Sequence, residues 1–434
     1  MSLVSNEGYQ KTAIGWIPSE WQFVPVNAIA QESTLRNGSN SELPVILCSK
    51  HIGFVRSLDY FKKQIFSNDT SNYKVVKRNW IAYPSNHIEE GSIGLQTICD
   101  AGIVSPIYTV FALNKAVEPD FIHRLFKTEL YRQQYVAAMN GSVDRRGSLR
   151  WAQFSQIRVP LPPLAEQQKI TAILKAVDDK LNVIARRIDA TRTLKQGLMQ
   201  TLFSRGVGAQ DAGDRWVPHA QFKESELGEI PVGWAVAPLG ELIEKLMDFR
   251  GRTPKKLGMD WGGGVIPALS ANNVRMGYID FDRECYLGSD ELYAAWMVQG
   301  DTRKNDLVFT MEAPLGNVAV IPDDRKYILS QRVVLLRANQ RIKHSYLFQY
   351  LRSDTFRKIL DVNSTGTTAK GIQQKRLVQL PVVLPPPKEQ VRIADMLGAI
   401  DRKLDALLSK QSHHQTLKRG LMQKLLTGEW RVQL

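Results

Sequence analysis

The sequence predicts an α+β protein built as an internal repeat. Two α+β domains are joined by two long helices, which form an antiparallel intramolecular coiled coil with pseudo-two-fold symmetry. Three observations predict this fold: a helical segment occurs twice, a short segment ahead of each domain occurs twice, and the residues between these shared segments differ. A chain of 434 residues with 43% apolar residues has room for about two to four domains and is too apolar to be mainly disordered.

The longest shared segment shows the repeat directly. Residues 161–202 align with residues 384–425 without a gap, and 19 of these 42 positions are identical. Each copy opens with Leu-Pro-Pro, continues with Glu-Gln and closes with Thr-Leu-Lys-x-Gly-Leu-Met-Gln. The short leading segments match at Ile17, Pro18 and Trp21, which correspond to Ile230, Pro231 and Trp234. The chain is therefore one unit written twice, with a divergent middle in each copy.

The divergent middles contain mixed elements. Alternating and β-branched runs predict strands at residues 75–83, 107–113, 305–310 and 332–337, and helical spacing predicts helices at 119–137 and 344–360. Together with the shared segments, these elements divide the chain into a first domain with its leading segment (1–160), a first long helix (161–205), a linker (206–226), a second domain (227–383), and a second long helix with a tail (384–434).

The two shared segments are predicted to be helices with a narrow apolar seam. Apolar residues recur at steps of four and three from Ile170 to Leu202, and the second copy repeats this spacing from Ile393 to Leu425. Such spacing is typical of a coiled coil, and the prolines before each run suit the start of a helix. Each seam has an obvious partner in the other copy. The alternative is that each helix packs only on its own domain.

Charge and cysteine usage bound the class of protein. The chain has 57 basic and 43 acidic residues, a net charge of +14 and a pI near 9.6. This excess of positive charge favours a polyanionic partner, and nucleic acid is favoured over a membrane surface. Cys48, Cys99 and Cys285 lack the spacing of a zinc or redox site, which indicates free thiols in a reducing compartment. Without a visible signal peptide or a long apolar run, we expect a cytoplasmic protein.

Common catalytic motifs are missing from the sequence. It contains no phosphate-binding loop, no Gly-x-Gly-x-x-Gly after a strand, no His-Glu-x-x-His and no Asn-Pro-Pro-Tyr of an amino-methyltransferase. The seven histidines do not cluster with carboxylates at ligand spacing, so no metal site is predicted. A nuclease centre of scattered acidic residues and lysines stays open as an alternative.

The candidate DNA-binding residues are basic and amide side chains in glycine-rich stretches of the divergent middles. Such side chains suit phosphate contacts and bidentate base contacts, although a solvated surface charge is an equally good interpretation of any single one. We interpret Trp151 and Trp261 as structural. The candidates are Lys50, Arg56, Lys62, Lys63, Arg145, Arg146 and Arg150 in the first domain, and Arg250, Arg252, Lys255, Lys256, Asn272, Asn273, Arg275, Thr367 and Lys370 in the second.

With these motifs in hand, nearly the whole chain resembles the specificity subunits of type I restriction-modification enzymes. The resemblance depends on the duplicated Leu-Pro-Pro-x-x-Glu-Gln-x-x-Ile start of each long helix and on its Leu-Lys-x-Gly-Leu-Met-Gln end. It also depends on Gly251-Arg-Thr-Pro254, Trp261-Gly-Gly and Ile266-Pro267 in the second domain, and on Ile-Pro-x-x-Trp before each domain. The first domain lacks the Gly-x-Thr-Pro pattern.

The resemblance implies a non-catalytic reader of double-stranded DNA. Each target-recognition domain would bind one half of a bipartite, asymmetric site, and the paired helices would set the spacing between the halves. Two modification subunits and two restriction subunits would dock on this chain, and S-adenosylmethionine, ATP and Mg would bind to those partners, with no cofactor on this chain. The rival hypotheses are a structural coiled-coil adaptor with an incidental basic surface and a stand-alone methyltransferase or nuclease.

Overall fold

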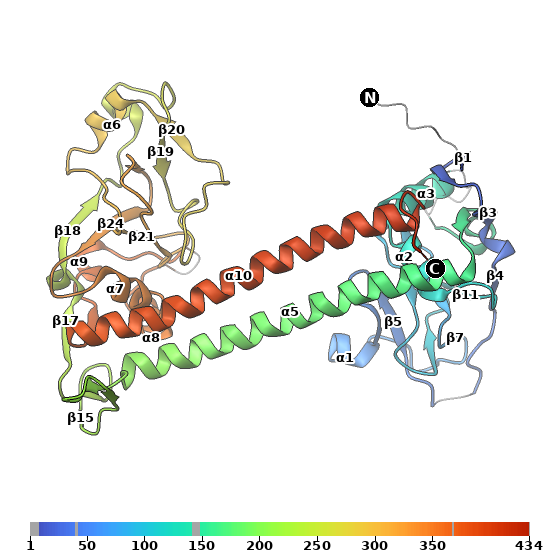
Figure 1. The fold of residues 1–434 in the computed structure, drawn as a ribbon, viewed down its shortest axis with the longest axis horizontal. Helices are drawn as coiled ribbons and strands as arrows, with labels where there is room; N and C mark the ends of the chain where they lie inside the picture. Colours follow the sequence, from blue (N-terminus) through green and yellow to red (C-terminus); the bar gives the residue numbers. More distant parts are fainter. Residues whose placement is uncertain (1–7, 40–41, 141–147, 367–368, 434) are drawn as a thin grey trace. The chain divides into compact units, whose positions relative to one another are not determined.

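The computed structural model describes residues 8–39, 42–140, 148–366 and 369–433. The chain divides into two compact units (Figure 1). The first unit is built from two separate stretches of the chain and the second from one continuous stretch. Unit 1 comprises Met1–Ala185 and Ser409–Leu434, and unit 2 comprises Arg186–Leu408. Each long helix therefore contributes one half to each unit.

Unit 1 contains the first divergent middle and a four-stranded antiparallel sheet of order β4-β11-β8-β9. Its strands are β1 (Tyr9–Thr12), β2 (Gly15–Pro18), β3 (Gln22–Pro25), β4 (Ala30–Glu32), β5 (Ile46–Ser49), β6 (Gly53–Arg56), β7 (Lys74–Lys77), β8 (Ile81–Pro84), β9 (Gly94–Leu95), β10 (Ala101–Val104), β11 (Tyr108–Leu113) and β12 (Arg158–Leu161). Its helices are η1 (Val26–Ala28), α1 (Ser57–Phe61), η2 (Ile88–Glu90), α2 (Pro119–Phe126), α3 (Glu129–Asn140), α4 (Trp151–Phe154) and the first part of α5 (Leu164–Ser204).

Unit 2 contains the linker, the second divergent middle and a four-stranded antiparallel sheet of order β18-β24-β21-β22. Its strands are β13 (Ala209–Gln210), β14 (Trp216–Val217), β15 (Phe222–Lys223), β16 (Ile230–Pro231), β17 (Ala235–Pro238), β18 (Ile243–Asp248), β19 (Ile266–Leu269), β20 (Tyr286–Gly288), β21 (Leu307–Thr310), β22 (Val318–Val320), β23 (Ile328–Leu329), β24 (Val333–Ala338) and β25 (Pro381–Leu384). Its helices are η3 (Leu239–Leu242), η4 (Pro254–Leu257), α6 (Asp290–Trp296), α7 (His344–Leu351), α8 (Asp354–Val362), α9 (Gln374–Leu377) and the first part of α10 (Pro387–Leu426).

The two sheets have the same topology, strand for strand. β4, β11, β8 and β9 occupy the places of β18, β24, β21 and β22, and in both units two helices and a short third helix follow the central strand. A two-stranded ladder then leads into the long helix, formed by β3 and β12 in unit 1 and by β17 and β25 in unit 2. The divergent middles thus share one frame although their sequences do not align.

Each sheet separates two apolar layers, because successive side chains on a strand point to opposite faces. On β11, Phe111 packs with the helices and the long-helix ends, whereas Val110 packs with β5 and β6. On β24, Leu336 faces the helices and Leu335 faces β19 and α6. In each unit, one face of the sheet is covered by the helices, and we call the layer on the opposite face the outer layer. The outer layer consists of β5, β6, β7, β10 and α1 in unit 1, and of β19, β20, β23, η4 and α6 in unit 2.

Three of the predicted elements are interrupted in the structure. The strand expected at 75–83 is two strands, β7 and β8, separated by a turn in which Asn79 has a left-handed φ of 64°. The helices expected at 119–137 and 344–360 are each two helices, α2 with α3 and α7 with α8. In the second pair Ser353 starts α8, since its hydroxyl accepts the backbone N–H of Phe356 at 3.1 Å, an N-cap that helical periodicity does not reveal.

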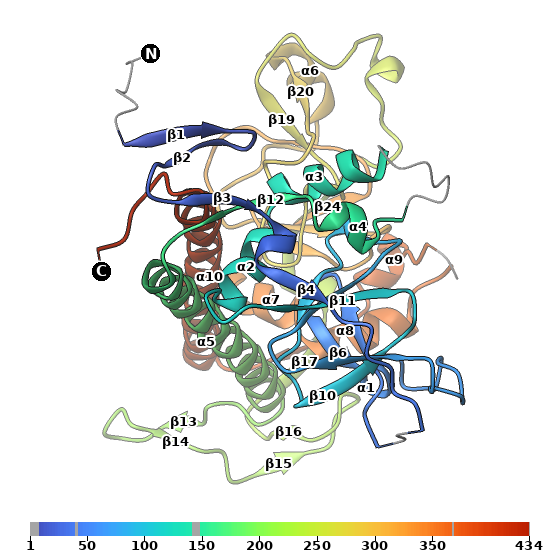
Figure 2. The same ribbon diagram turned by 90° about the vertical axis from the view of Figure 1, so that its right-hand side faces the viewer.

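In each unit the start of one long helix packs beside the end of the other, so α5 and α10 run antiparallel. Figure 2 shows the two helices side by side, viewed nearly along their axes. In unit 1, Ile170 and Leu174 of α5 share a core with Leu425 and Leu426 of α10. In unit 2, Ile393 of α10 joins the core that includes the end of α5. This arrangement is the antiparallel coiled coil that the repeated seam predicts.

Two lysines at equivalent positions of the repeat form matched ion pairs between the helices. Lys195 Nζ lies 2.6 Å from Asp401 in unit 2, and Lys418 Nζ lies 2.6 Å from Asp178 in unit 1. Lys195 aligns with Lys418 and Asp178 with Asp401 in the repeat. The same helix-to-helix bond is therefore made twice, once in each unit.

The Glu-Gln pair of the repeated motif connects each long helix to its domain. Gln167 accepts the backbone N–H of Glu118 at 2.8 Å, and Gln390 accepts that of Lys343 at 2.7 Å. Their amide groups also donate to the carbonyl of the first proline residue, Pro162 or Pro385, at 2.8 and 2.9 Å. These buried hydrogen bonds explain why the motif is the same in both copies.

Candidate nucleic-acid interface

The candidate cations of unit 1 gather on its outer layer. Lys50 follows β5 and Arg56 ends β6, while Lys62 and Lys63 follow α1 directly. All four side chains are exposed and form no ion pair or side-chain hydrogen bond with other described residues. The backbone beneath them is held in place, because Lys127 donates to the carbonyl of Lys50 at 2.8 Å.

Exposed apolar side chains lie among these cations, which the sequence analysis did not single out. Ile52 at the hairpin turn is 68% exposed, and Leu58, Tyr60, Phe61 and Ile65 around α1 are also exposed. An exposed apolar group beside unpaired cations is typical of an interaction surface, and apolar wedges next to basic residues are one way in which proteins contact DNA. We call this surface the α1 surface.

Arg150 lies apart from the α1 surface, at the start of α4. It is exposed and lines a cavity of about 570 Å³ with Trp151 and Lys74. Burial lowers the pKa of Lys74, whose ammonium donates to the carbonyl of Tyr108 at 2.5 Å. Trp151 packs on Phe111 with ring centres 5.3 Å apart, in keeping with a structural role. Arg145 and Arg146 lie outside the described residues.

In unit 2 most of the candidate cations bind to their own domain. Arg250 forms a bidentate pair with Asp248 at 2.6 to 3.0 Å. Arg252 donates to the carbonyls of Ala295 and Trp296 at 3.1 and 2.6 Å, at the end of α6. Lys256 donates to the carbonyl of Gly251 at 2.7 Å, and Lys370 pairs with Asp361 at 3.0 Å.

Only part of the second candidate set therefore remains available to a ligand. Lys255 is exposed and has no side-chain partner among the described residues. The Nε atom of Arg275 lies 3.8 Å from a carboxylate oxygen of Asp280. The Nη2 atom of the same guanidinium is buried and has no hydrogen-bond partner among the described residues. Thr367 lies outside the described residues. Sequence reasoning could not separate Lys255 from Arg252, because both are basic residues in one glycine-rich stretch.

The two asparagines divide in the same way. Asn273 is 1% exposed, and its side chain contacts Ser270 and the carbonyls of Asp280, Arg283 and Glu284, so it organises the loop. Asn272 is exposed and lines a cavity of about 450 Å³ in the outer layer. Of the two adjacent candidates, Asn272 is accessible to a ligand and Asn273 is structural.

Arg332 is a residue that the sequence analysis placed in a strand and did not select. It precedes β24 with a left-handed φ of 66°, which is uncommon for a residue other than glycine, and its side chain is half exposed. Strained backbone of this kind often occurs at functional sites. The corresponding position before β11 is Ile107, which is also exposed. No sequence signal distinguishes Arg332 from an ordinary strand residue.

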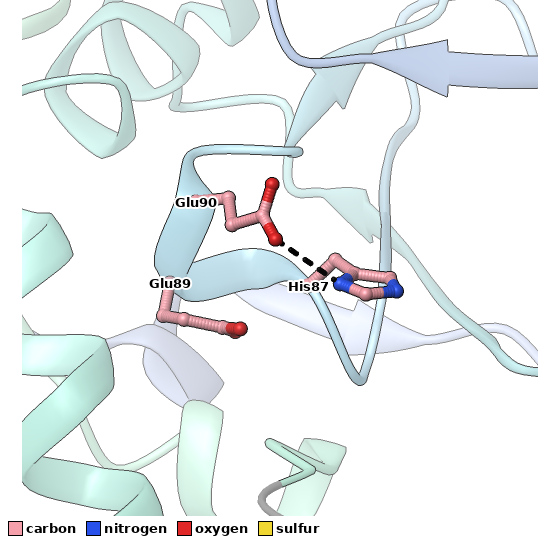
Figure 3. A group of neighbouring side chains, drawn as sticks. All are labelled: His87, Glu89 and Glu90. Carbon is pink, nitrogen blue, oxygen red and sulfur yellow. Dashed lines mark ion pairs between the residues drawn. The ribbon is translucent and has the colours of Figure 1, made fainter.

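One histidine lies close to two carboxylates at once within the part of the chain that the structure describes, unlike the sequence-based expectation. His87, Glu89 and Glu90 have ligand atoms within 4.8 Å of one another, and His87 Nδ1 lies 3.4 Å from Glu90 (Figure 3). All three belong to the short turn around η2, and His87 and Glu90 are more than half exposed. We interpret the group as a surface ion pair. Cys48 is a free thiol packed in the core of unit 1, and burial raises its pKa to about 12.

No helix among the described residues is both long enough and apolar enough to cross a bilayer.

A family model described as the type I restriction modification DNA specificity domain matches residues 47–191 and 231–414. Each match covers a divergent middle and much of the long helix that follows it.

Similar proteins extend over the whole chain. The putative MjaX specificity subunit of a type I restriction enzyme from Methanocaldococcus jannaschii is 25% identical and aligns with 100% of this chain and 99% of its own length. The MjaVIII specificity subunit of the same organism is 30% identical over 64% of this chain and 63% of its own. The type I S subunit from M. genitalium has the same fold, with a TM-score of 0.55, 13% identity, and 93% and 96% of the two chains covered. The chain belongs to the type I restriction-modification DNA specificity family.

Proposed function

We propose that this chain recognises a bipartite, asymmetric site in double-stranded DNA, with one domain for each half-site, and holds partner subunits without itself catalysing a reaction. One observation carries the proposal. The two units have the same sheet and the same helical frame, but they carry different outer layers. A duplicated frame with two different surfaces suits two independent readings of one duplex.

The outer layers support different contacts in the two half-sites. The α1 surface presents Lys50, Arg56, Lys62 and Lys63 beside exposed apolar groups, which suits phosphate contacts and shape recognition. In its described residues, the outer layer of unit 2 presents one unpaired lysine, Lys255, and polar groups around a cavity. An adaptor with an incidental basic surface gives no reason for this division of chemistry.

The repeat also supports two copies of one partner. In the Thr-Leu-Lys-x-Gly segment, Leu194 and Leu417 are 52% and 44% exposed at equivalent positions. Next to them are Gly197 and Gly420, where no atom lies within 4 Å of the place of a Cβ. Glycine inside a helix costs about 1 kcal/mol relative to alanine, so its presence in both copies suits the close approach of another helix. We propose that two modification subunits dock at these patches.

The rest of the assembly follows from the family. We propose that two restriction subunits join the modification subunits, and that S-adenosylmethionine, ATP and Mg bind to those partners. Methyl transfer from labelled S-adenosylmethionine by the purified chain alone would favour the stand-alone methyltransferase instead.

A domain exchange tests the division of labour. Replacing residues 26–157, which lie between β3 and β12, with the corresponding segment of another family member leaves the ladder and the long helices intact. In complex with its modification subunits, the chimera should methylate a site that differs in one half only. The mirror exchange of residues 239–380, between β17 and β25, should change only the other half. Mapping of methylated bases checks both chimeras, and a change in both halves after one exchange would contradict the proposal.

A further inference from the structure

The cavity in the outer layer of unit 2 has aromatic walls. Trp296 is 1% exposed and donates from its indole nitrogen to the carbonyl of Leu329 at 3.0 Å, so it forms a rigid floor. Trp261 packs on Trp296 with ring centres 5.4 Å apart, and Tyr286 stacks on Trp261 at 5.3 Å with planes 8° apart. Tyr286 is 57% exposed and carries one ring face to the solvent. We call this cavity the aromatic pocket.

The volume of the aromatic pocket, about 450 Å³, is that of a small-ligand site. Protein pockets that bind small planar ligands commonly measure about 300–1,000 Å³ and combine aromatic walls with a few polar groups. Planar aromatic surfaces of this kind are also used to stack nucleic-acid bases. Size and shape therefore suit a nucleobase.

The charges that line the pocket argue against a phosphate. Arg252 is engaged with the carbonyls at the end of α6, which leaves Lys255 as the cation without a partner among the described residues. Asp260 and Glu284 line the same pocket, and neither carboxylate has a side-chain partner among those residues. The carbonyls that Arg252 binds are neutral, so its charge remains, and the two carboxylates balance the two cations of the lining. The pocket therefore has no excess positive charge that would favour an anion.

The same groups suit a hydrogen-bond donor. Asp260 and Glu284 can only accept when they are ionised, and the amide of Gln331 can accept as well as donate. The Asn272 amide oxygen accepts from Arg283 at 3.3 Å and keeps one further lone pair for a ligand. In base recognition, carboxylates accept from the amino group of cytosine and amides pair with adenine. Both of these bases carry an exocyclic amino group, which guanine presents only in the minor groove and thymine lacks.

We propose that the aromatic pocket contacts one base of the second half-site and accepts a hydrogen bond from the exocyclic amino group of adenine or cytosine, with Glu284 and Asp260 as the acceptors. This inference rests on the proposed function, and it names specificity-determining residues within it. Asn272 and Gln331 orient the base, and Tyr286 limits its position from the side.

The test deletes the amino group and its acceptor in turn. The full chain is assembled with its modification subunits on duplexes that carry the mapped site. In the second half-site, each adenine is replaced in turn by purine and each cytosine by 2-pyrimidinone, which removes only the amino group. With the wild-type chain, one position should lose affinity by about 10-fold to 100-fold. With Glu284→Ala or Asp260→Ala, the same replacement should cost less than about threefold, because the acceptor is gone.

Controls separate this result from misfolding and from failure of the proposed function. Asp282→Ala removes an exposed carboxylate two residues from Glu284 that does not line the pocket, and it should keep the wild-type penalty. If the pocket variants keep the full penalty at every position, the inference is overturned. If the wild-type assembly shows no preference for any DNA sequence, the proposed function itself fails. Fluorescence of 2-aminopurine beside the sensitive position distinguishes a base extruded into the pocket from one contacted at the groove edge.

Discussion

Two buried glutamates occupy equivalent places in the two units, and their partners differ. Glu166 in unit 1 is 1% exposed and accepts from Trp21 at 3.0 Å and from Arg431 at 2.8 Å. Glu389 in unit 2 is 2% exposed and accepts from Trp234 at 2.8 Å. It also accepts the backbone N–H groups of Val207 and Gly208 at 2.8 and 3.0 Å and lies 3.1 Å from His219.

The difference shows which segments of the chain supply hydrogen-bond donors to the buried glutamate of each unit. The tryptophan and the glutamate come from the shared segments, so their hydrogen bond is the same in both units. The remaining donors come from the segment that follows the other long helix: the tail after α10 for Glu166, and the linker after α5 for Glu389. The tail and the linker are thus structural counterparts. A buried carboxylate needs donors, and each segment supplies them by different chemistry.

The largest expected effect is the loss of the glutamate in unit 2. Glu389→Ala would leave the Trp234 indole and two backbone N–H groups buried without an acceptor, which should lower the free energy of unfolding of unit 2 by about 3–5 kcal/mol. Glu166→Ala should cost unit 1 about 2 kcal/mol, because only Trp21 is left buried and Arg431 can still pair with Glu20.

Urea unfolding of the full chain, followed by hydrogen exchange in each unit, checks this order. Glu224→Ala removes an exposed carboxylate and should leave both units unchanged. Equal losses for Glu389→Ala and Glu166→Ala would show that the additional donors in unit 2 do not contribute.

The donors should rank in the opposite order. Arg431→Ala leaves Glu166 with Trp21 alone and should destabilise unit 1 by about 2 kcal/mol, a figure discounted because Arg431 is 39% exposed. His219→Ala leaves Glu389 with three donors and should cost unit 2 about 1 kcal/mol. Arg431→Lys should restore part of the loss. A larger effect of His219→Ala, measured by the same unfolding assay, would reverse the interpretation of the two sites.

The sequence predicts the shared parts of the fold well, for a physical reason. Helical seams, prolines at helix starts and the Glu-Gln motif act locally and appear twice, so the antiparallel pair of long helices follows from the repeat alone. The interruptions between α2 and α3 and between α7 and α8 are not predicted, because the periodic apolar pattern continues across the break and only the packing shows it.

The candidate site is predicted only in part. The sequence locates the basic stretches, but it does not show which cations are already bound within the domain. Arg250 pairs with Asp248 two residues away, whereas Arg252 reaches carbonyls more than 40 residues further along the chain. The aromatic pocket joins residues from 252 to 331, and the stack of Tyr286 on Trp261 has no local signal. Long-range contacts of this kind decide which polar groups remain free.

The smallest expected effect concerns the ion pairs between the long helices, where the two units again differ. Asp401 accepts from Lys195 at 2.6 Å, from Arg352 at 2.7 Å and from Gln349 at 2.9 Å, whereas Asp178 accepts from Lys418 and Arg124. Burial alone would raise the pKa of Asp401, but hydrogen bonds and charge from Arg352, with help from Gln349 and Lys195, hold it below its usual value. Burial lowers the pKa of Lys195, and the nearby charge of Arg352 adds to this lowering.

Because the pKa of Asp401 is lowered in the folded chain, the stability of unit 2 depends on pH in the acidic range. In the unfolded chain an aspartate has a pKa of about 3.9, so the unfolded chain binds a proton on Asp401 more readily than the folded chain does. The free energy of unfolding therefore increases with pH in this range. The contribution of Asp401 is complete above the unfolded pKa and is lost as the pH falls through the lower folded pKa. We therefore expect Asp401→Asn to cost unit 2 about 1 kcal/mol near pH 7 and progressively less below about pH 4. Urea unfolding across this range checks the slope, and Asp395→Asn, an exposed change on the same helix, should keep the wild-type pH dependence. If Asp401→Asn leaves the acid dependence of unit 2 unchanged, then another carboxylate is responsible for it, and the additional donors on Asp401 serve only to align the two helices.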